Sequence, residues 1–393
     1  NVRDNIFFSY SMPPPIDLKA LRALVPEYCF KPSLTISLYY LFRDLILSTF
    51  LIIISITLIP TLSTTSLRVF AWALYGWLQG LIFTGLWVLG HECGHGAFSS
   101  YKALNDRIGF ALHSTLLTPY FAWRLTHRRH HLYAGHMDKD NNHVPLRHAD
   151  YLRLFGAQVN QNMQDAPLYV LWRLLLQQFL GWPLYLMYGI TGGSNSTPRK
   201  PTGKIAEKSH FNPASALFLE SEFNAIAISD VGIATTVLSL FWVGKVIGFS
   251  RLFLLYGQPF LWLNQWIVAL TYLQHTHPNI PRHEAASWTF AKGATATVDR
   301  DIGILGRFFL HNVIDCHVVH HLFPSIPFYY AMEATRAVRP VLGDAYHKDS
   351  QNVVLSLWKT FRNCQYVASD DSLPANNRAL WFQRGKIPPL GHV

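Results

Sequence analysis

Stretches of apolar residues alternate with polar segments along the chain, and four of these stretches are almost free of charged side chains. A helix that crosses a bilayer needs ~20 consecutive, mostly apolar residues. One such stretch is also compatible with a buried helix of a soluble protein, but four in one chain favour a membrane protein. The predicted transmembrane helices cover residues of about 45–62, 69–90, 228–249 and 252–273.

A fifth apolar stretch, about residues 168–190, differs from these four because it contains Arg173, two glutamines and Pro183. Aromatic residues recur through it, and such a mixture is typical of an amphipathic helix that lies in the membrane surface. We therefore predict an interfacial helix here rather than a fifth span. The polar segments divide the chain into residues 1–44, 45–346 and 347–393, of which the middle region is the membrane domain.

The composition agrees with this interpretation. Half of the 393 residues are hydrophobic and only 14% are charged, against roughly 25% in an average soluble protein, and the mean hydropathy is +0.14. The net charge of +10 does not indicate nucleic acid, because the basic residues are dispersed and no RNA- or DNA-binding motif is present. The four cysteines form no CxxC pair, which argues against a disulfide framework or a zinc ribbon.

Three of the patterns formed by the 19 histidines lie beyond the ends of predicted spans. One HxxxH cluster follows the second span, one HxxHH cluster comes after it, and another HxxHH cluster lies beyond the fourth span. Residues three or four apart share a face of a helix, so each cluster can present two or three imidazoles to one point. Their members are His91, His95, His127, His130, His131, His317, His320 and His321.

Imidazole binds iron, copper and zinc, and a ligand set without cysteine argues against an iron–sulfur cluster. Eight histidines are too many for one ion, since zinc sites use about four ligands. Two metal ions fit the count. All three clusters must then lie on one side of the membrane, and the two spans between the second and third clusters return the chain to that side. A span at residues 168–190 would separate the clusters, which again favours the interfacial interpretation.

At these positions the sequence resembles the membrane fatty acid desaturases, in particular the oleate (delta-12 or omega-6) branch and its fungal relatives. The resemblance extends from about residue 18 to residue 346. The matching strings are GHECGHGAFS, HRRHH with the following GHMDKD, TYLQHTHPNIP, TVDRDIGIL and HNVIDCHVVHHLFPSIPFYYAMEATRAVRP.

The resemblance implies an all-α integral membrane protein, in which four transmembrane helices carry a cytosolic, histidine-rich cap with two iron ions. It also implies a multi-pass protein of the endoplasmic reticulum whose active site and terminal regions face the cytosol. Members of the family use O2 to introduce a cis double bond into an acyl chain esterified to phospholipid. Their electrons come from NAD(P)H through cytochrome b5 and its reductase, and no fused haem-binding segment is visible here.

The family's eight histidine ligands map onto the eight histidines above. Related di-iron membrane enzymes have a ninth histidine four residues after a polar residue at the end of the fourth span, and Thr271 with His275 matches that placement. His277 is the alternative. Carboxylates often orient the imidazoles of a metal site, although ordinary salt bridges in loops would also explain acidic residues near the clusters. The candidates are Asp138, Asp140, Asp299, Asp301 and Asp315.

Two departures from the family affect the ligand set and the expected product. Gly96 stands where plant members generally have a further histidine, so no ligand is assigned there. Gly90 stands where plant oleate desaturases usually have alanine, and glycine is frequent there in acetylenases, conjugases, hydroxylases and epoxygenases. An acetylenase, a hydroxylase or an omega-3 desaturase therefore remains an alternative to the delta-12 desaturase.

Two hypotheses from other classes explain fewer residues. HECGH resembles the HExxH pattern of zinc proteases, with Glu92 as the base, but a membrane zinc hydrolase leaves both HxxHH clusters unexplained. A metal transporter requires polar residues within the spans, whereas these histidines lie beyond the span ends. The number and kind of bound metal ions distinguish the three.

Overall fold

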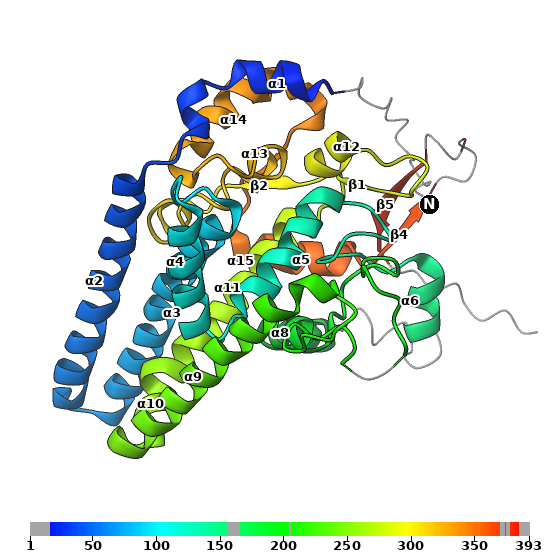
Figure 1. Ribbon diagram of the computed structural model, residues 1–393. Helices are drawn as coiled ribbons and strands as arrows, with labels where there is room; N and C mark the ends of the chain where they lie inside the picture. Colours follow the sequence, from blue (N-terminus) through cyan, green and yellow to red (C-terminus); the bar gives the residue numbers. More distant parts are fainter. Residues whose placement is uncertain (1–15, 156–165, 204–205, 370–373, 375–377, 385–393) are drawn as a thin grey trace, which may run out of the picture.

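Two helical hairpins form the centre of the protein, as the computed structural model shows for residues 16–155, 166–203, 206–369, 374 and 378–384. In Figure 1 the turns of both hairpins lie at the same, lower-left end of the molecule. The first hairpin consists of α2 (Leu34–Leu58), the short η2 (Ile59–Thr61) and α3 (Thr65–His95). The second consists of η3 (Glu220–Glu222), α9 (Phe223–Ile247), α10 (Phe249–Leu252), the π-helical turn η4 (Phe253–Gly257) and α11 (Gln258–His275).

Three helical segments of the described residues are long and apolar enough to cross a membrane: Leu34–Thr61, Thr65–His95 and Glu220–Ile247. They correspond to the first three predicted spans. The fourth predicted stretch is helical too, but it is divided among α10, η4 and α11 and is more polar. Large apolar side chains such as Phe50 on α2 and Trp242 on α9 are exposed, which is the arrangement expected of helices surrounded by lipid.

Close packing of α3 against α11 depends on small residues. A Cβ atom at Gly76 would overlap the side chain of Gln258, and a Cβ atom at Gly80 would overlap that of Trp262. Glycine therefore allows the two helices to approach closely, as small residues do between membrane helices. This contact places the carboxyl end of α3 and the carboxyl end of α11 at the same end of the bundle (Figure 1).

The predicted interfacial helix is α8 (Pro167–Tyr188), which runs across the bundle and is seen nearly end-on in Figure 1. Trp172 and Leu176 are exposed on one face, whereas Leu174 and Gln178 are buried on the opposite face. This two-sided character is what a helix in the plane of the membrane surface requires. Two further helices, α4 (Lys102–Thr115) and α5 (Tyr120–Tyr133), lie between the hairpins.

Shorter elements cover the end of the bundle opposite the hairpin turns (Figure 1). Their core includes Leu21, Val319 and Val338, which pack together although they are far apart in the chain. The helices are α1 (Leu18–Leu24), η1 (Glu27–Phe30), α6 (His148–Phe155), α12 (Phe290–Thr295), η5 (Leu305–Phe309), α13 (His317–Leu322), α14 (Phe328–Leu342), η6 (Gly343–Ala345) and α15 (Val353–Asn363).

The all-helical expectation omitted five short strands that occur among the described residues. An antiparallel sheet has the order β1-β5-β4, and a parallel pair joins β2 to β3. The strands are β1 (Pro281–His283), β2 (Val298–Arg300), β3 (His347–Asp349), β4 (Tyr366–Ser369) and β5 (Ala379–Gln383). Three of the five strands belong to the predicted polar tail, which therefore folds onto the rest of the protein.

The predicted region boundaries fall within folded structure, because Asp44 lies in α2 and Tyr346 directly precedes β3. Residues 1–15 and 385–393 of the predicted terminal regions lie outside the described residues.

Candidate metal centre

The first histidine cluster lies at the carboxyl end of α3. Gly96 ends the helix with a left-handed φ of 71°, and its N–H donates to the carbonyls of Glu92 and Cys93. Glycine is the usual residue in this conformation because it has no Cβ. The four-residue spacing puts His91 and His95 on one face, with ring centroids 4.6 Å apart.

The second and third clusters lie on α5 and α13. On α5, Nε2 of His131 lies 3.1 Å from Nε2 of His127. The short helix α13 is held at its amino end by Asp299, whose carboxylate accepts a hydrogen bond of 2.8 Å from the Val318 N–H. Val318 itself is fully buried. Backbone hydrogen bonds thus fix the ends of the helices that carry the first and third clusters.

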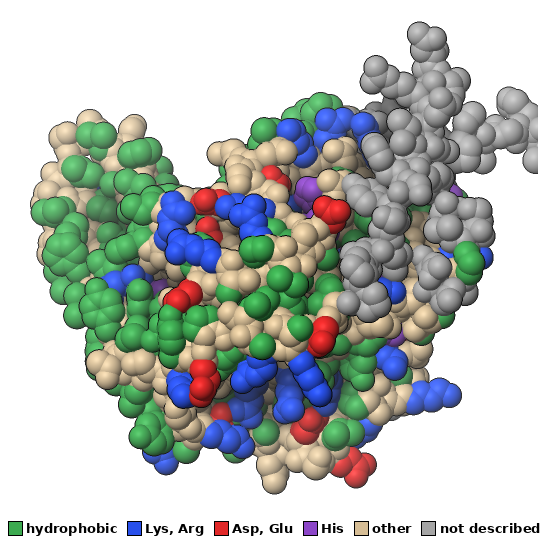
Figure 2. Space-filling view, turned by 90° about the horizontal axis from the view of Figure 1, so that it is seen from above, with side chains coloured by type: hydrophobic (Ala, Val, Ile, Leu, Met, Phe, Trp, Pro, Cys, Tyr) green, Lys and Arg blue, Asp and Glu red, His purple; other side chains and the backbone are tan. Residues whose placement is uncertain are grey.

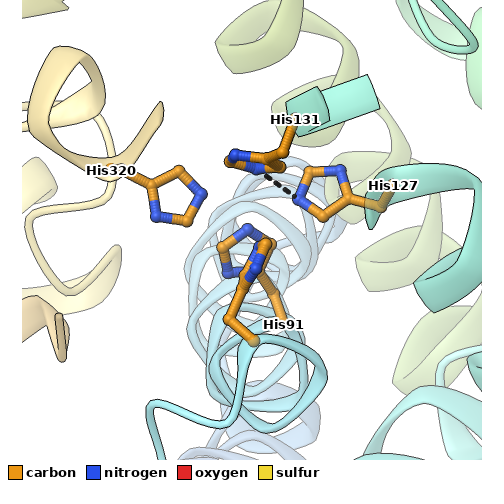
Figure 3. A group of neighbouring side chains, drawn as sticks. His91, His127, His131 and His320 are labelled. Carbon is orange, nitrogen blue, oxygen red and sulfur yellow. Dashed lines mark hydrogen bonds between the residues drawn. The ribbon is translucent and has the colours of Figure 1, made fainter. Parts of the chain in front are cut away.

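Five imidazoles from the three clusters meet in one group, in which every ligand nitrogen lies within 4.8 Å of the others. Figure 3 shows four of them converging from three helices, α3, α5 and α13. The rings of His91 and His320, which are far apart in the chain, have centroids 4.8 Å apart. The members of this first group are His91, His95, His127, His131 and His320.

A second group lies beside the first. It consists of His130, His275 and His321, again with ligand nitrogens within 4.8 Å of one another. The Nε2 atom of His317 joins it, 3.0 Å from Nε2 of His275. The stacked rings of His131 and His321, with centroids 4.2 Å apart, connect the two groups. All nine histidines predicted as ligands therefore come together, and they do so around two points.

His277, the alternative ninth ligand, points elsewhere. Its Nδ1 accepts a hydrogen bond of 3.1 Å from the backbone N–H of Asn279, and it belongs to neither group. The structure therefore favours His275 at this position.

The donor set fits metal binding. Buried ring nitrogens of His95, His320 and His321 have no hydrogen-bond partner among the described residues, although buried polar atoms are normally paired. Burial lowers the pKa of His320 to about 3 and holds the pKa of His131 well below its usual range. These imidazoles are therefore neutral, which is the form that binds metal ions.

Only one of the five predicted carboxylates contacts an imidazole of the two groups. Oδ1 of Asp140 lies 2.6 Å from Nδ1 of His130. Asp299 instead supports the backbone of α13, Asp138 contacts Arg147, and Asp301 accepts from the N–H of Gly303.

Asp315 makes no such contact. Its Oδ2 is buried without a hydrogen-bond partner in the described part of the chain, and burial raises the pKa of this carboxyl to about 6.

Two supporting contacts were not predicted from the sequence. Glu92 accepts a hydrogen bond of 3.0 Å from the Phe328 N–H at the start of α14, while its other oxygen lies 3.4 Å from Nδ1 of His91. The guanidinium of Arg282 donates to the carbonyl of His275. The sequence offers one signal for such residues, a charged side chain within an otherwise apolar or helical pattern. This signal does not show which residue the side chain contacts.

Several openings lie near the histidines in the described part of the chain, and one of about 240 Å³ is lined by His95 and His127. A recess of about 450 Å³ is lined by His95 together with Lys102, Arg124 and Arg128. Figure 2 shows Lys and Arg side chains gathered on the upper face of the molecule, and hydrophobic side chains on the side where α2 lies. A smaller cavity of about 80 Å³ lies between α8 and α11 and is lined by Trp182, Tyr185 and other residues.

Comparison with known proteins identifies relatives over almost the whole chain. The family model described as fatty acid desaturase matches residues 69–352. A Delta(12)-acyl-lipid-desaturase of Punica granatum is 40% identical over 375 residues, covering 95% of this chain and 92% of the relative. An omega-6 fatty acid desaturase, endoplasmic reticulum, of Brassica juncea is 39% identical, covering 91% and 89%. An oleate hydroxylase of Claviceps purpurea is 35% identical, covering 95% and 82%.

Proposed function

The chain belongs to the fatty acid desaturase family, and from this premise we propose that it is an acyl-lipid desaturase that converts oleoyl to linoleoyl chains in a membrane lipid. The observation that carries this proposal is the meeting of nine imidazoles around two points at one end of an apolar helical bundle. A membrane zinc hydrolase needs only one such point.

The two groups of histidines would hold two iron ions, with His317 completing the second group. Imidazole ligands without thiolates suit iron. When bound, the iron pair supplies the oxidising power to break an unactivated C–H bond, which no side chain can provide. Overall, two adjacent carbons each lose one hydrogen, a donor supplies two electrons and the solvent two protons, and O2 is reduced to two molecules of water.

The side chains around the centre orient the ligands. Asp140 accepts a hydrogen bond from Nδ1 of His130, which leaves Nε2 of that ring facing the second group. Such carboxylate–histidine pairs fix the tautomer of a ligand. Glu92 joins the first cluster to the start of α14 and so keeps His91 close to α13.

The acyl chain requires a dry, apolar path. The cavity between α8 and α11 is walled by Trp182, Tyr185 and Ile267, and it reaches His143. The Nε2 atom of His143 lies 3.1 Å from Oγ1 of Thr276, the residue after His275. We propose that this cavity is part of the acyl path, since it combines aromatic walls with proximity to the second group.

We further propose four spans, with α11 as the fourth, in the membrane of the endoplasmic reticulum. Both hairpin turns lie at one end of the bundle and both histidine-bearing helix ends lie at the other (Figure 1), so an even number of crossings separates the clusters. The terminal regions 1–44 and 347–393 and the metal centre then face the cytosol. Cytochrome b5 and its reductase would deliver electrons from NAD(P)H there.

The proposal is tested by expressing the chain in a yeast that makes oleate but no linoleate. Gas chromatography of the membrane lipids should reveal a diene with the new double bond at delta-12, and a variant with His91→Ala should form none. Unaltered monoenes, with protein and donor both present, would contradict the proposal. Iron analysis of the purified protein should give about two ions per chain, whereas one zinc ion per chain would support the hydrolase.

One observation favours a second product: a hydroxylase is 35% identical to this chain over 95% of its length. A hydroxy-acid in the same lipid analysis would identify that activity. An alkyne would identify an acetylenase, and a triene an omega-3 desaturase.

A further inference from the structure

A buried contact joins the first membrane helix to the loop that precedes the third histidine cluster. Nε2 of His311 lies 2.7 Å from Oδ2 of Asp44 in α2. The His311 side chain is fully buried and that of Asp44 is only 4% exposed. A carboxylate buried to this extent is costly unless it is paired.

The other oxygen of Asp44 is also occupied. Oδ1 accepts hydrogen bonds of 2.8 and 2.7 Å from Nε and Nη2 of Arg43, and the same guanidinium donates to the carbonyl of Phe308, 2.7 Å away. The loop is therefore held at two residues, Phe308 by its hydrogen bond from Arg43 and His311 by its contact with Asp44.

These contacts stabilise an unfavourable backbone conformation at His311 and Asn312. His311 and Asn312 have φ values of 53° and 55°, in the left-handed region that side chains with a Cβ rarely adopt. Consecutive residues in this region persist only where surrounding contacts impose them. The ring of His311 also packs against Tyr40 and Phe328, with centroids 5.5 and 4.8 Å away.

The backbone of α3 leaves room for the contact. A Cβ atom at Gly85 would lie 3.2 Å from both Oδ2 of Asp44 and Nε2 of His311, and closer still to the Phe309 carbonyl. The loop beyond His311 is held by Gln274, which donates 2.9 Å to the Val313 carbonyl, and α13 begins with His317. The bend at residues 311–312 thus sets the direction in which the chain enters the third cluster.

We propose that Asp44 and His311 are positioning residues that aim His317 at the second group of histidines. This inference rests on the proposed di-iron centre. Breaking the contact should weaken binding of the iron ion held by the second group, while the first group, four of whose members lie on α3 and α5, keeps its ion.

The test measures iron per chain, iron affinity and the thermal unfolding midpoint of the purified full-length protein. Asp44→Ala should lower iron from about two ions to about one per chain, with affinity at the weaker site reduced roughly 10- to 100-fold, as for outer partners of other metal sites. His311→Asn tests the other partner, since asparagine tolerates the left-handed conformation but cannot reach Asp44. Asp44→Asn, which retains an acceptor, should recover part of the affinity.

Ser48→Ala provides the matched control. Ser48 is buried one turn further along α2 and bonds to Gln79 of α3, so it tests the packing of the same two helices without touching the loop. Iron affinities in Asp44→Ala and His311→Asn that equal that of Ser48→Ala would overturn the inference. A wild-type protein without bound iron would instead overturn the proposed metal centre.

Discussion

Oδ1 of Asp140 lies 2.6 Å from Nδ1 of His130, and each side chain is only 1% exposed. Asp140 also accepts hydrogen bonds from the backbone N–H groups of Asn142 and Gly135. The carboxylate is therefore fixed by the loop before it orients the imidazole. Burial alone would raise the pKa of Asp140, but the contacts with His130 and with the Asn142 N–H stabilise the ionised form and lower it.

Asp140→Asn should weaken iron binding about 10- to 100-fold, because an amide holds the tautomer of His130 less firmly than a carboxylate does. Iron titration of the purified apo-protein measures this. Asp138→Asn is the control, since the Asp138 carboxylate contacts Arg147 and Ser194 instead of a ligand. Equal losses of iron affinity in the two variants would show that iron binding depends on the conformation of the loop and not on the contact between Asp140 and His130.

The ninth ligand is tested by comparing two histidines that lie two residues apart. His275→Ala should remove about one iron ion per chain and abolish product formation, because Nε2 of His275 lies within 3.2 Å of Nε2 of both His130 and His317. His277→Ala should retain both ions, since His277 bonds to the Asn279 backbone. Metal analysis with product analysis by gas chromatography distinguishes the two, and the reverse result would reassign the ligand.

Much of the candidate metal site can be predicted from the sequence because the spacings of the proposed ligands are local. His91 and His95, four residues apart, need only a helix to meet, and α3 provides it. The supporting carboxylates are not visible in this way. Asp315 stands two residues before His317, but the intervening Cys316 lies outside helical geometry with a φ of −134°, so Asp315 is not on the helix that carries the ligands.

Contacts between distant segments could not be predicted from the sequence either, because they do not follow from a local spacing. Asp44 and His311 are separated by 267 positions, and neither belongs to a periodic pattern that would indicate the other. Strand β5 pairs with β1, although most of the carboxyl-terminal third of the chain separates them. The register of this pair depends on how the two strands pack in the fold, and the pattern within either strand alone does not predict it. The predicted polar tail was therefore missed as part of the fold.

That tail supports the second group through Phe382. Its ring lies 5.5 Å from the guanidinium of Arg282, which donates to the His275 carbonyl, and Phe382 is 6% exposed. Phe382→Ala should destabilise the protein by about 3–5 kcal/mol, as core phenylalanine truncations do, and should lower iron occupancy. Thermal unfolding measures the first effect. Gln383→Ala, a half-buried position on the same strand, should change stability by less than ~0.5 kcal/mol.

Acid should destabilise the protein in part through His210. Burial lowers the pKa of His210 to about 4, and its Nδ1 donates to the Leu186 carbonyl, 3.2 Å away. Since the folded pKa lies below the unfolded value of ~6.5, the unfolded state takes up the proton first as pH falls. Stability therefore decreases from about pH 6.5 to about pH 4, with a slope of up to ~1.4 kcal/mol per pH unit.

His210→Gln should flatten this dependence when the unfolding midpoint of the iron-loaded protein is measured between pH 7 and pH 4. Loading with iron keeps the ligand histidines from titrating in the folded state. His148→Gln, at an exposed histidine of α6, is the control. An unchanged slope in His210→Gln would mean that other buried groups dominate acid unfolding.

The last prediction concerns Gly90 of α3, which faces the ring of His113. A Cβ atom at residue 90 would overlap Cδ2 of that ring. His113 is fully buried, donates 2.9 Å from Nε2 to the Trp87 carbonyl, and stacks on Trp87 with centroids 5.1 Å apart. Gly90→Ala should therefore destabilise the protein by about 1–3 kcal/mol through overpacking, even though alanine favours a helix by roughly 1 kcal/mol.

Removing the obstructing ring should reverse the sign of this effect. In a His113→Ala background the added methyl group meets space instead of the imidazole, so Gly90→Ala should be neutral or stabilising there. A double-mutant cycle on thermal or denaturant unfolding measures the coupling, expected at 1 kcal/mol or more for residues in contact. Additive effects would mean that His113 moves aside without cost. In that case the substitution would not displace Trp87 or His91, whose ring centroids are 6.0 Å apart. Iron binding would then stay unchanged.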